Sequence, residues 1–196
     1  MRQDSENDVG ALRRGRQLEV VTLSWNVGGV IVLAIAAVGA RSVALAGFGL
    51  DSVIEIGAST VVLWELAQVA QTRQRKALRL IGSSFVALAI YLAVQSTIVL
   101  VIGFRPHHSS LGIVWTAMTA AVMFALALGK KNIGTSLDNP VLKAEGRVTL
   151  IDAILATAVL VGLTLNAVLG WWWADPVTGY VILYYALREA RASFTS

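Results

Sequence analysis

Residues 45–66 read LAGFGLDSVIEIGASTVVLWEL and are the most informative part of the chain. The segment is long enough to cross a bilayer, since about 20 mostly apolar residues span the hydrocarbon core. Asp51 and Glu55 lie four positions apart, so both project from one face of a helix, and Ser59 continues that face. A spanning helix with two acids on one face is typical of a helix that turns this face toward other helices, away from lipid.

The whole chain has the composition of a small membrane protein. It has 196 residues, of which 56% are apolar and 14% are charged, and its mean hydropathy is +0.69. Soluble domains are about 45–50% apolar and about 25% charged, which argues against an ordinary soluble enzyme. The chain contains no cysteine, so thiolate metal sites and cysteine nucleophiles are excluded. The net charge of +4 does not indicate nucleic-acid binding, because the basic residues flank apolar runs.

Repeated apolar runs predict an all-α, polytopic membrane protein with six transmembrane helices. Residues 1–17 are polar and mixed in charge, and we expect a disordered cytoplasmic tail there. We expect residues 18–192 to form the six-helix domain, and we expect no C-terminal soluble domain. The sixth run is short for a span, but Asp175 and Pro176 favour a helix start, with Asp175 as its N-cap. The expected spans are 20–40, 42–64, 80–104, 111–129, 148–170 and 176–187.

The uneven distribution of Lys and Arg sets the orientation of these helices. Only Arg41 and Arg105 fall on one side of the predicted topology. The other fourteen fall on the opposite side, so the positive-inside rule places both termini in the cytoplasm of a plasma (inner) membrane protein. These fourteen are Arg2, Arg13, Arg14, Arg16, Arg73, Arg75, Lys76, Arg79, Lys130, Lys131, Lys143, Arg147, Arg188 and Arg191.

Three carboxylates lie well inside the apolar runs: Asp51, Glu55 and Asp152. An unpaired charge near the bilayer centre costs about 2.5–3.5 kcal/mol, so such residues usually serve a function. Glu55 and Asp152 both fall near the middle of their spans, where we expect them to face each other around a cation. Low dielectric and mutual repulsion favour protonated acids, so a divalent cation would displace protons on binding. The alternative is that one or two of the acids are protonated and hydrogen-bonded between packed helices.

Enzyme motifs are not recognisable in the sequence. It has no Gly-rich phosphate loop, no zinc-ligand spacing and no Ser/His/Asp arrangement, so we expect a transporter with neither catalytic residues nor a cofactor. The histidines, His107 and His108, are adjacent in the loop FRPHHSS, and we interpret them as a solvated pair. A transient metal contact there is the alternative.

Residues 45–66 resemble the second transmembrane helix of the cation diffusion facilitator (cation efflux) family. That helix carries an acid or a histidine, three residues, and then an acid followed by small residues, and Asp51 and Glu55 match these two positions. Asp152, the sequence WWADP at 172–176 and YYALREA at 184–190 are similar to the family's fifth and sixth helices. The resemblance covers the transmembrane domain only. It implies that the first, second, fourth and fifth helices surround a metal site, while the third and sixth pair beside them.

One position departs from the family pattern. The family's fifth helix carries a histidine four positions before its aspartate, and this chain has Val148 there. The remaining matching ligands are carboxylates, which suit Mn²⁺, Mg²⁺ or Fe²⁺ better than Zn²⁺, with Co²⁺ also open. Glu145 is a candidate access residue, and Asn26, Thr149 or a water is a candidate for the missing ligand.

The resemblance implies a homodimer that exports a divalent metal cation in exchange for protons by alternating access. Because we expect no soluble domain of the kind that family members commonly carry, we expect the dimer to form through membrane helices. Two alternatives remain open. The chain is either a transporter of this fold whose site has changed to another substrate, or a non-transporting membrane subunit or scaffold.

Overall fold

The computed structural model describes residues 2–65, 71–136 and 140–195, which fold as six α-helices. Within these ranges there is no β-strand, in agreement with the predicted all-α fold. The helices are α1 (Arg2–Ala40), α2 (Val43–Glu65), α3 (Gln71–Ile102), α4 (Ser110–Ser136), α5 (Pro140–Leu169) and α6 (Ala174–Thr195).

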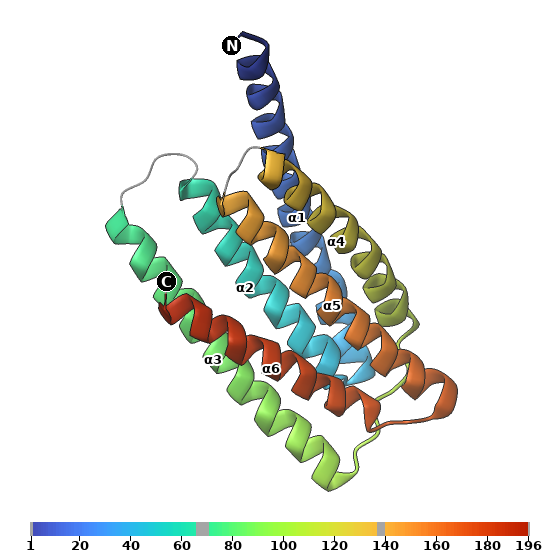
Figure 1. The fold of residues 1–196 in the computed structure, drawn as a ribbon. Coiled ribbons are helices and arrows are strands. Elements are labelled where there is room, and N and C mark those ends of the chain that lie inside the picture. The colour runs from blue at the N-terminus through green and yellow to red at the C-terminus, as the bar shows by residue number, and fades with distance from the viewer. Residues whose placement is uncertain (1, 66–70, 137–139, 196) are drawn as a thin grey trace.

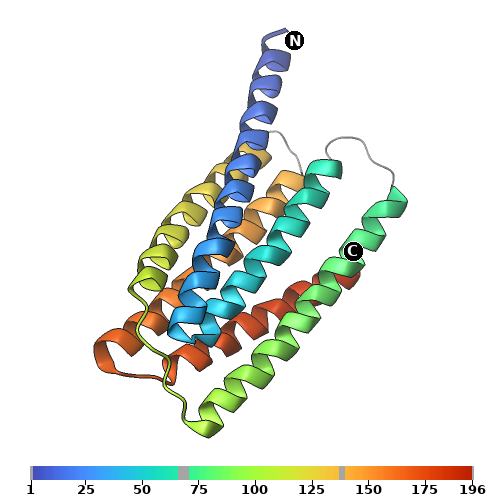
Figure 2. The same ribbon diagram turned by 180° about the vertical axis from the view of Figure 1, so that it is seen from behind.

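The six helices form two groups, which Figures 1 and 2 show from opposite sides. In the first group α1 packs on α2 and α4, α4 packs along α5, and α2 also contacts α5. In the second group α3 packs along α6, and this pair lies against α2 and α5. The hydroxyls of Thr97 and Tyr180 share a hydrogen bond of 2.6 Å between α3 and α6. This arrangement is the one that the family resemblance implies.

Local sequence explains where several helices begin and end. Ser42 and Ser109 precede α2 and α4, and each hydroxyl accepts a hydrogen bond from the backbone N–H three residues later, at 3.1 and 3.0 Å. Such N-caps satisfy donors that the helix itself leaves unpaired. Gly103 and Gly170 follow α3 and α5 with φ of 69° and 65°, a left-handed conformation that glycine adopts without strain.

Asp175 of α6 caps α2 from outside. Its Oδ2 accepts hydrogen bonds from the N–H groups of Val43 and Ala44 at 2.9 and 3.3 Å, and its Oδ1 accepts one from the hydroxyl of Ser42. The prediction that Asp175 caps its own helix is therefore wrong, because α6 already begins at Ala174. The carboxylate instead fixes the start of α6 to the start of α2.

The N-terminal segment also differs from its prediction. α1 begins at Arg2, so the helix continues through residues 2–17, where the sequence predicted a disordered tail. The segment contains no proline, the residue that most disfavours a helix interior. Because the apolar part of α1 already forms a helix, its extension needs no new nucleation.

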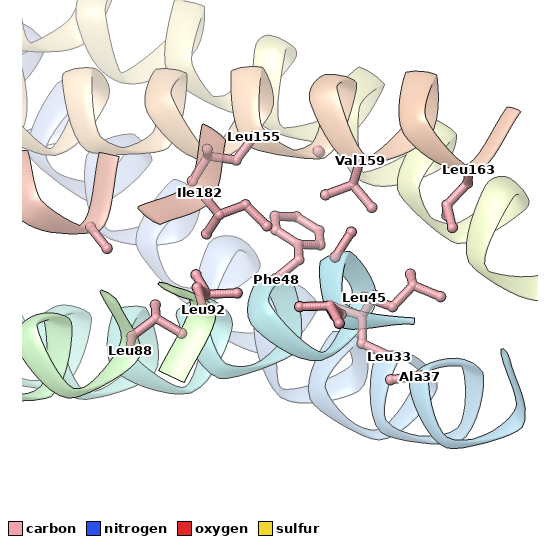
Figure 3. Close-up of a cluster of buried hydrophobic side chains, with 14 of the residues drawn as sticks. Leu33, Ala37, Leu45, Phe48, Leu88, Leu92, Leu155, Val159, Leu163 and Ile182 are labelled. Carbon is pink, nitrogen blue, oxygen red and sulfur yellow. The ribbon is translucent and has the colours of Figure 1, made fainter. Parts of the chain in front are cut away.

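The core is built around α2, as Figure 3 shows. Phe48 of α2 is fully buried, and the hydrophobic cluster that contains it includes side chains from every other helix. They include Leu33 of α1, Leu92 of α3, Val159 of α5 and Ile182 of α6. α2 is therefore held on several sides, and this fixes the direction of the acids that follow Phe48 along it.

The outer surface of the helices is apolar as well. Ile31, Val38 and Val101 are 62%, 79% and 80% exposed, which suits contact with lipid better than contact with water. Among the described residues, four segments are long and apolar enough to cross a membrane: Arg13–Ala40, Gly82–Ile102, Ser110–Ser136 and Gly146–Leu169. They belong to α1, α3, α4 and α5. That α2 and α6 also cross, and that both termini are cytoplasmic, stay predictions.

Candidate metal centre

Three of the predicted site residues come together inside the bundle. Asp51 and Glu55 of α2 and Asp152 of α5 each offer one carboxylate oxygen, and these oxygens lie within 4.8 Å of one another. The three side chains are 4%, 9% and 1% exposed. The two acids of α2 share a face because they are four residues apart, and the packing of α2 against α5 places Asp152 opposite them.

Asp152 is the least satisfied of these acids. Neither of its carboxylate oxygens has a hydrogen-bond partner among the described residues, although the side chain is almost fully buried. Buried polar groups are nearly always hydrogen-bonded, and a buried carboxylate without partners is costly. A cation held between Asp152 and the acids of α2 would satisfy these oxygens.

α1 adds Asn26 to the site. Its Nδ2 donates a hydrogen bond of 3.0 Å to Oε2 of Glu55, and the side chain is 2% exposed. The preceding residue, Trp25, fixes α1 against α4, since its indole N–H donates to Thr119 at 3.1 Å and its ring stacks on Trp115 at 5.0 Å. Asn26 is thus positioned beside Glu55, and an amide oxygen is a ligand type that hard cations accept.

Val148 lies where the family pattern has a histidine. It lines a small cavity together with Asp51 and Glu55, and α6 contributes Tyr185 and Glu189 to the same cavity. A ligand at this position would therefore face the acids, and valine supplies no donor atom. Glu189 is a further acid near the site that the sequence pattern does not single out.

The other predicted accessory residues have different placements. The hydroxyl of Thr149 accepts a hydrogen bond of 3.0 Å from the ammonium group of Lys130. The side chain of Glu145 lies outside the described residues. His107 and His108 are exposed in the segment between α3 and α4, and the N–H of His107 donates to the carbonyl of Ala40 at 2.8 Å.

The sequence predicts that Lys130 lies in the connection after the fourth span, but the structure places it inside α4. α4 continues to Ser136, and Lys130 is fully buried within it, where its Nζ lies 3.0 Å from Oε2 of Glu19. The apolar run ends at residue 129 because two lysines follow. Helical spacing was the available signal, since Lys130 follows the buried Met123, Leu126 and Ala127 on one face.

The donor atoms limit what this site can bind. Three carboxylates and one amide in a buried, low-dielectric setting attract a cation and supply oxygen ligands. Oxygen-only sets suit hard divalent ions, whereas zinc sites usually include nitrogen or sulfur.

A search of curated proteins finds no match to the chain. The family model described as the cation efflux transmembrane domain matches residues 20–196. The match includes all four residues of the site and every helix, apart from the first part of α1. The chain is therefore an integral membrane protein that belongs to the cation efflux family, a family of metal cation transporters.

Proposed function

We propose that this protein exports a divalent metal cation across the plasma (inner) membrane in exchange for protons, with the ion held by Asp51, Glu55 and Asp152. The observation that carries the proposal is Asp152, a buried acid of α5 whose oxygens have no hydrogen-bond partner among the described residues and face two acids of α2. An acid that serves only to join helices would be hydrogen-bonded to its neighbour.

The ligand set favours a hard ion. Because all candidate donors are oxygens and Val148 offers none, Mn²⁺, Fe²⁺ and Mg²⁺ fit better than Zn²⁺, with Co²⁺ between them. The ion is the transported substrate and not a resident cofactor.

Charge balance supports the exchange for protons. Three neighbouring carboxylates in a low-dielectric interior repel one another strongly, so they need a cation, protons or both. When the ion leaves, protons are the available replacement, and an ion that returns to the site displaces them. Alternating exposure of the site to the two sides of the membrane then couples the ion flux to the proton gradient.

The distribution of basic residues supports cytoplasmic termini. Arg41 and Arg105 belong to one end of the helical bundle, whereas Arg13, Arg14 and Arg16 precede the apolar part of α1 at the other. We also expect the functional unit to be a homodimer that forms through membrane helices. Cross-linking of the protein in native membranes tests this expectation.

Metal flux into proteoliposomes under an imposed pH gradient tests the function. Mn²⁺, Fe²⁺, Co²⁺, Zn²⁺ and Mg²⁺ are compared for the unmodified chain, Asp51→Asn and Asp152→Asn. Asp4→Asn is the matched control, because it makes the same chemical change about 33 Å along α1 from Asn26. We expect gradient-dependent flux of a hard ion in the unmodified chain and the control, and none in the two site variants. If a folded unmodified chain carries none of the five ions, the transporter proposal fails and a scaffold role is favoured.

A further inference from the structure

A buried lysine lies beside the metal site. Lys130 of α4 is 0% exposed, and its Nζ donates hydrogen bonds of 3.0 Å to Oε2 of Glu19 on α1 and 3.0 Å to Oγ1 of Thr149 on α5. Glu19 is 1% exposed. The bundle that holds the three acids therefore also contains a buried ion pair between α1 and α4, which is hydrogen-bonded to α5.

Close packing of α4 on α5 brings the lysine to this place. A Cβ at Gly146 of α5 would lie 3.1 Å from the backbone nitrogen of Lys131 and 3.3 Å from Cβ of Lys130. The absence of a side chain at Gly146 thus lets the two backbones approach each other at the point where the charged residue enters the interior of the bundle.

The contribution of this ion pair to folding stability does not explain why the protein contains it. Removing two charges from solvent costs much of what their attraction returns, and apolar residues of similar volume often stabilise a protein as well or better. The pair also lies in a transporter whose substrate is a cation, where a fixed positive charge opposes the substrate. Its position relative to the site therefore matters more than its contribution to folding.

The positive end of the pair is hydrogen-bonded to the helix that carries Asp152. Thr149, which accepts a hydrogen bond from Lys130, lies three residues before Asp152 on α5, about one helical turn away. Lys130 and Asp152 are both almost fully buried, and the Asp152 carboxylate has no hydrogen-bond partner among the described residues. Charges in a low-dielectric interior are weakly screened, so the ammonium group and the carboxylate attract each other. Lys130 is thus the charge of the pair that is bonded to α5, one turn from Asp152, and Glu19 holds it from the α1 side.

We propose that Lys130 is a positioning residue that lowers the affinity of the carboxylate site, because its fixed charge competes with the metal ion for Asp152. Glu19 and Thr149 hold the ammonium group in place for this role. The proposal rests on the proposed function, since it assigns a release-promoting residue to that same site. A transporter needs an ion to leave as well as to bind, and three carboxylates without an opposing charge would hold a divalent cation too long.

The experiment removes both charges of the pair together. The double variant Glu19→Gln, Lys130→Met keeps similar side-chain volumes and leaves neither charge buried alone. Mn²⁺ binding to the purified protein in detergent is followed by electron paramagnetic resonance, and Mn²⁺ flux is measured in proteoliposomes. We expect the Kd to fall about tenfold, since Lys130 is bonded to α5 one turn from Asp152 and the loss of its charge outweighs the loss of Glu19 on α1. The KM for flux should fall with it, and kcat should fall because release becomes slower.

A charge-swapped variant, Glu19→Lys with Lys130→Glu, keeps an ion pair and reverses its direction. The affinity for Mn²⁺ should increase from the unmodified chain to the double variant with no charges, and should be highest in the charge-swapped variant. Gel filtration and circular dichroism establish which variants are folded. A folded variant of either kind with an unchanged or higher Kd overturns the proposal and leaves Lys130 as a packing residue. If the unmodified chain binds and transports no metal, the proposed function fails instead, so the two failures are distinguishable.

Discussion

Replacement of Asp175 by alanine tests whether a side chain of α6 fixes the start of α2. Asp175 is 0% exposed, and its Oδ2 accepts hydrogen bonds from the N–H groups of Val43 and Ala44 at 2.9 and 3.3 Å. Alanine leaves these two buried donors without their acceptor. Each such loss costs about 1–2 kcal/mol, so the free energy of unfolding should fall by about 3 kcal/mol.

The corresponding loss of thermal stability is large enough to measure in detergent. For a chain of this length, about 1 kcal/mol changes Tm by about 2–4 °C, so Asp175→Ala should lower Tm by about 6–12 °C. Asp175→Asn keeps one oxygen that can accept from the backbone donors, and we expect a decrease of only about 2–4 °C.

A matched control defines the background of this measurement. Thr164 is exposed on α5, and its hydroxyl donates a hydrogen bond to the carbonyl of Leu160 in its own helix. Thr164→Ala should change Tm by no more than about 2 °C, as surface substitutions usually do. The reasoning is refuted if Asp175→Ala unfolds at the same temperature as the unmodified chain.

Three further substitutions test the site and its supports. Val148→His places a nitrogen donor in the cavity that Asp51 and Glu55 also line. In competition titrations, the affinity for Zn²⁺ should therefore rise at least about tenfold relative to that for Mn²⁺. An unchanged ratio of the two affinities would show that a side chain at position 148 does not reach the bound ion. Asn26→Leu removes the donor to Glu55 and should weaken Mn²⁺ binding about tenfold, whereas Asn26→Asp, which retains an oxygen, should lose less. Gly146→Val forces α4 from α5 and should cost about 1–3 kcal/mol in thermal unfolding, and a stable variant would argue against the close contact.

The helices were predictable because charged or turn-forming residues separate the apolar runs from one another. Their ends were less predictable. α4 reaches Ser136 and α5 begins at Pro140, so both extend well beyond the apolar runs that predicted them. Hydropathy reports which residues suit the bilayer, whereas a helix continues as long as its backbone hydrogen bonds do. The same reason accounts for the helical residues 2–17.

The three acids were predictable because each lies inside an apolar run, and helical spacing places Asp51 and Glu55 on one face. Partners contributed by distant helices were not predictable. Nothing in the order of residues links Lys130 to Glu19, or Asp175 to the start of α2, because these contacts depend on how the helices pack. Tertiary packing of this kind also buries Lys130, which directly follows an apolar run and was expected in a connection between helices.

The most direct measurement is a Mn²⁺ titration of the purified protein, followed by electron paramagnetic resonance. The unmodified chain should bind one Mn²⁺ ion at the site formed by Asp51, Glu55 and Asp152, and Asp4→Asn should bind it equally well. Asp51→Asn and Asp152→Asn, with their folds intact, should each weaken binding by at least about 100-fold, because each removes a charged ligand from a buried site. Unchanged binding in either folded site variant would contradict the assignment of the metal centre.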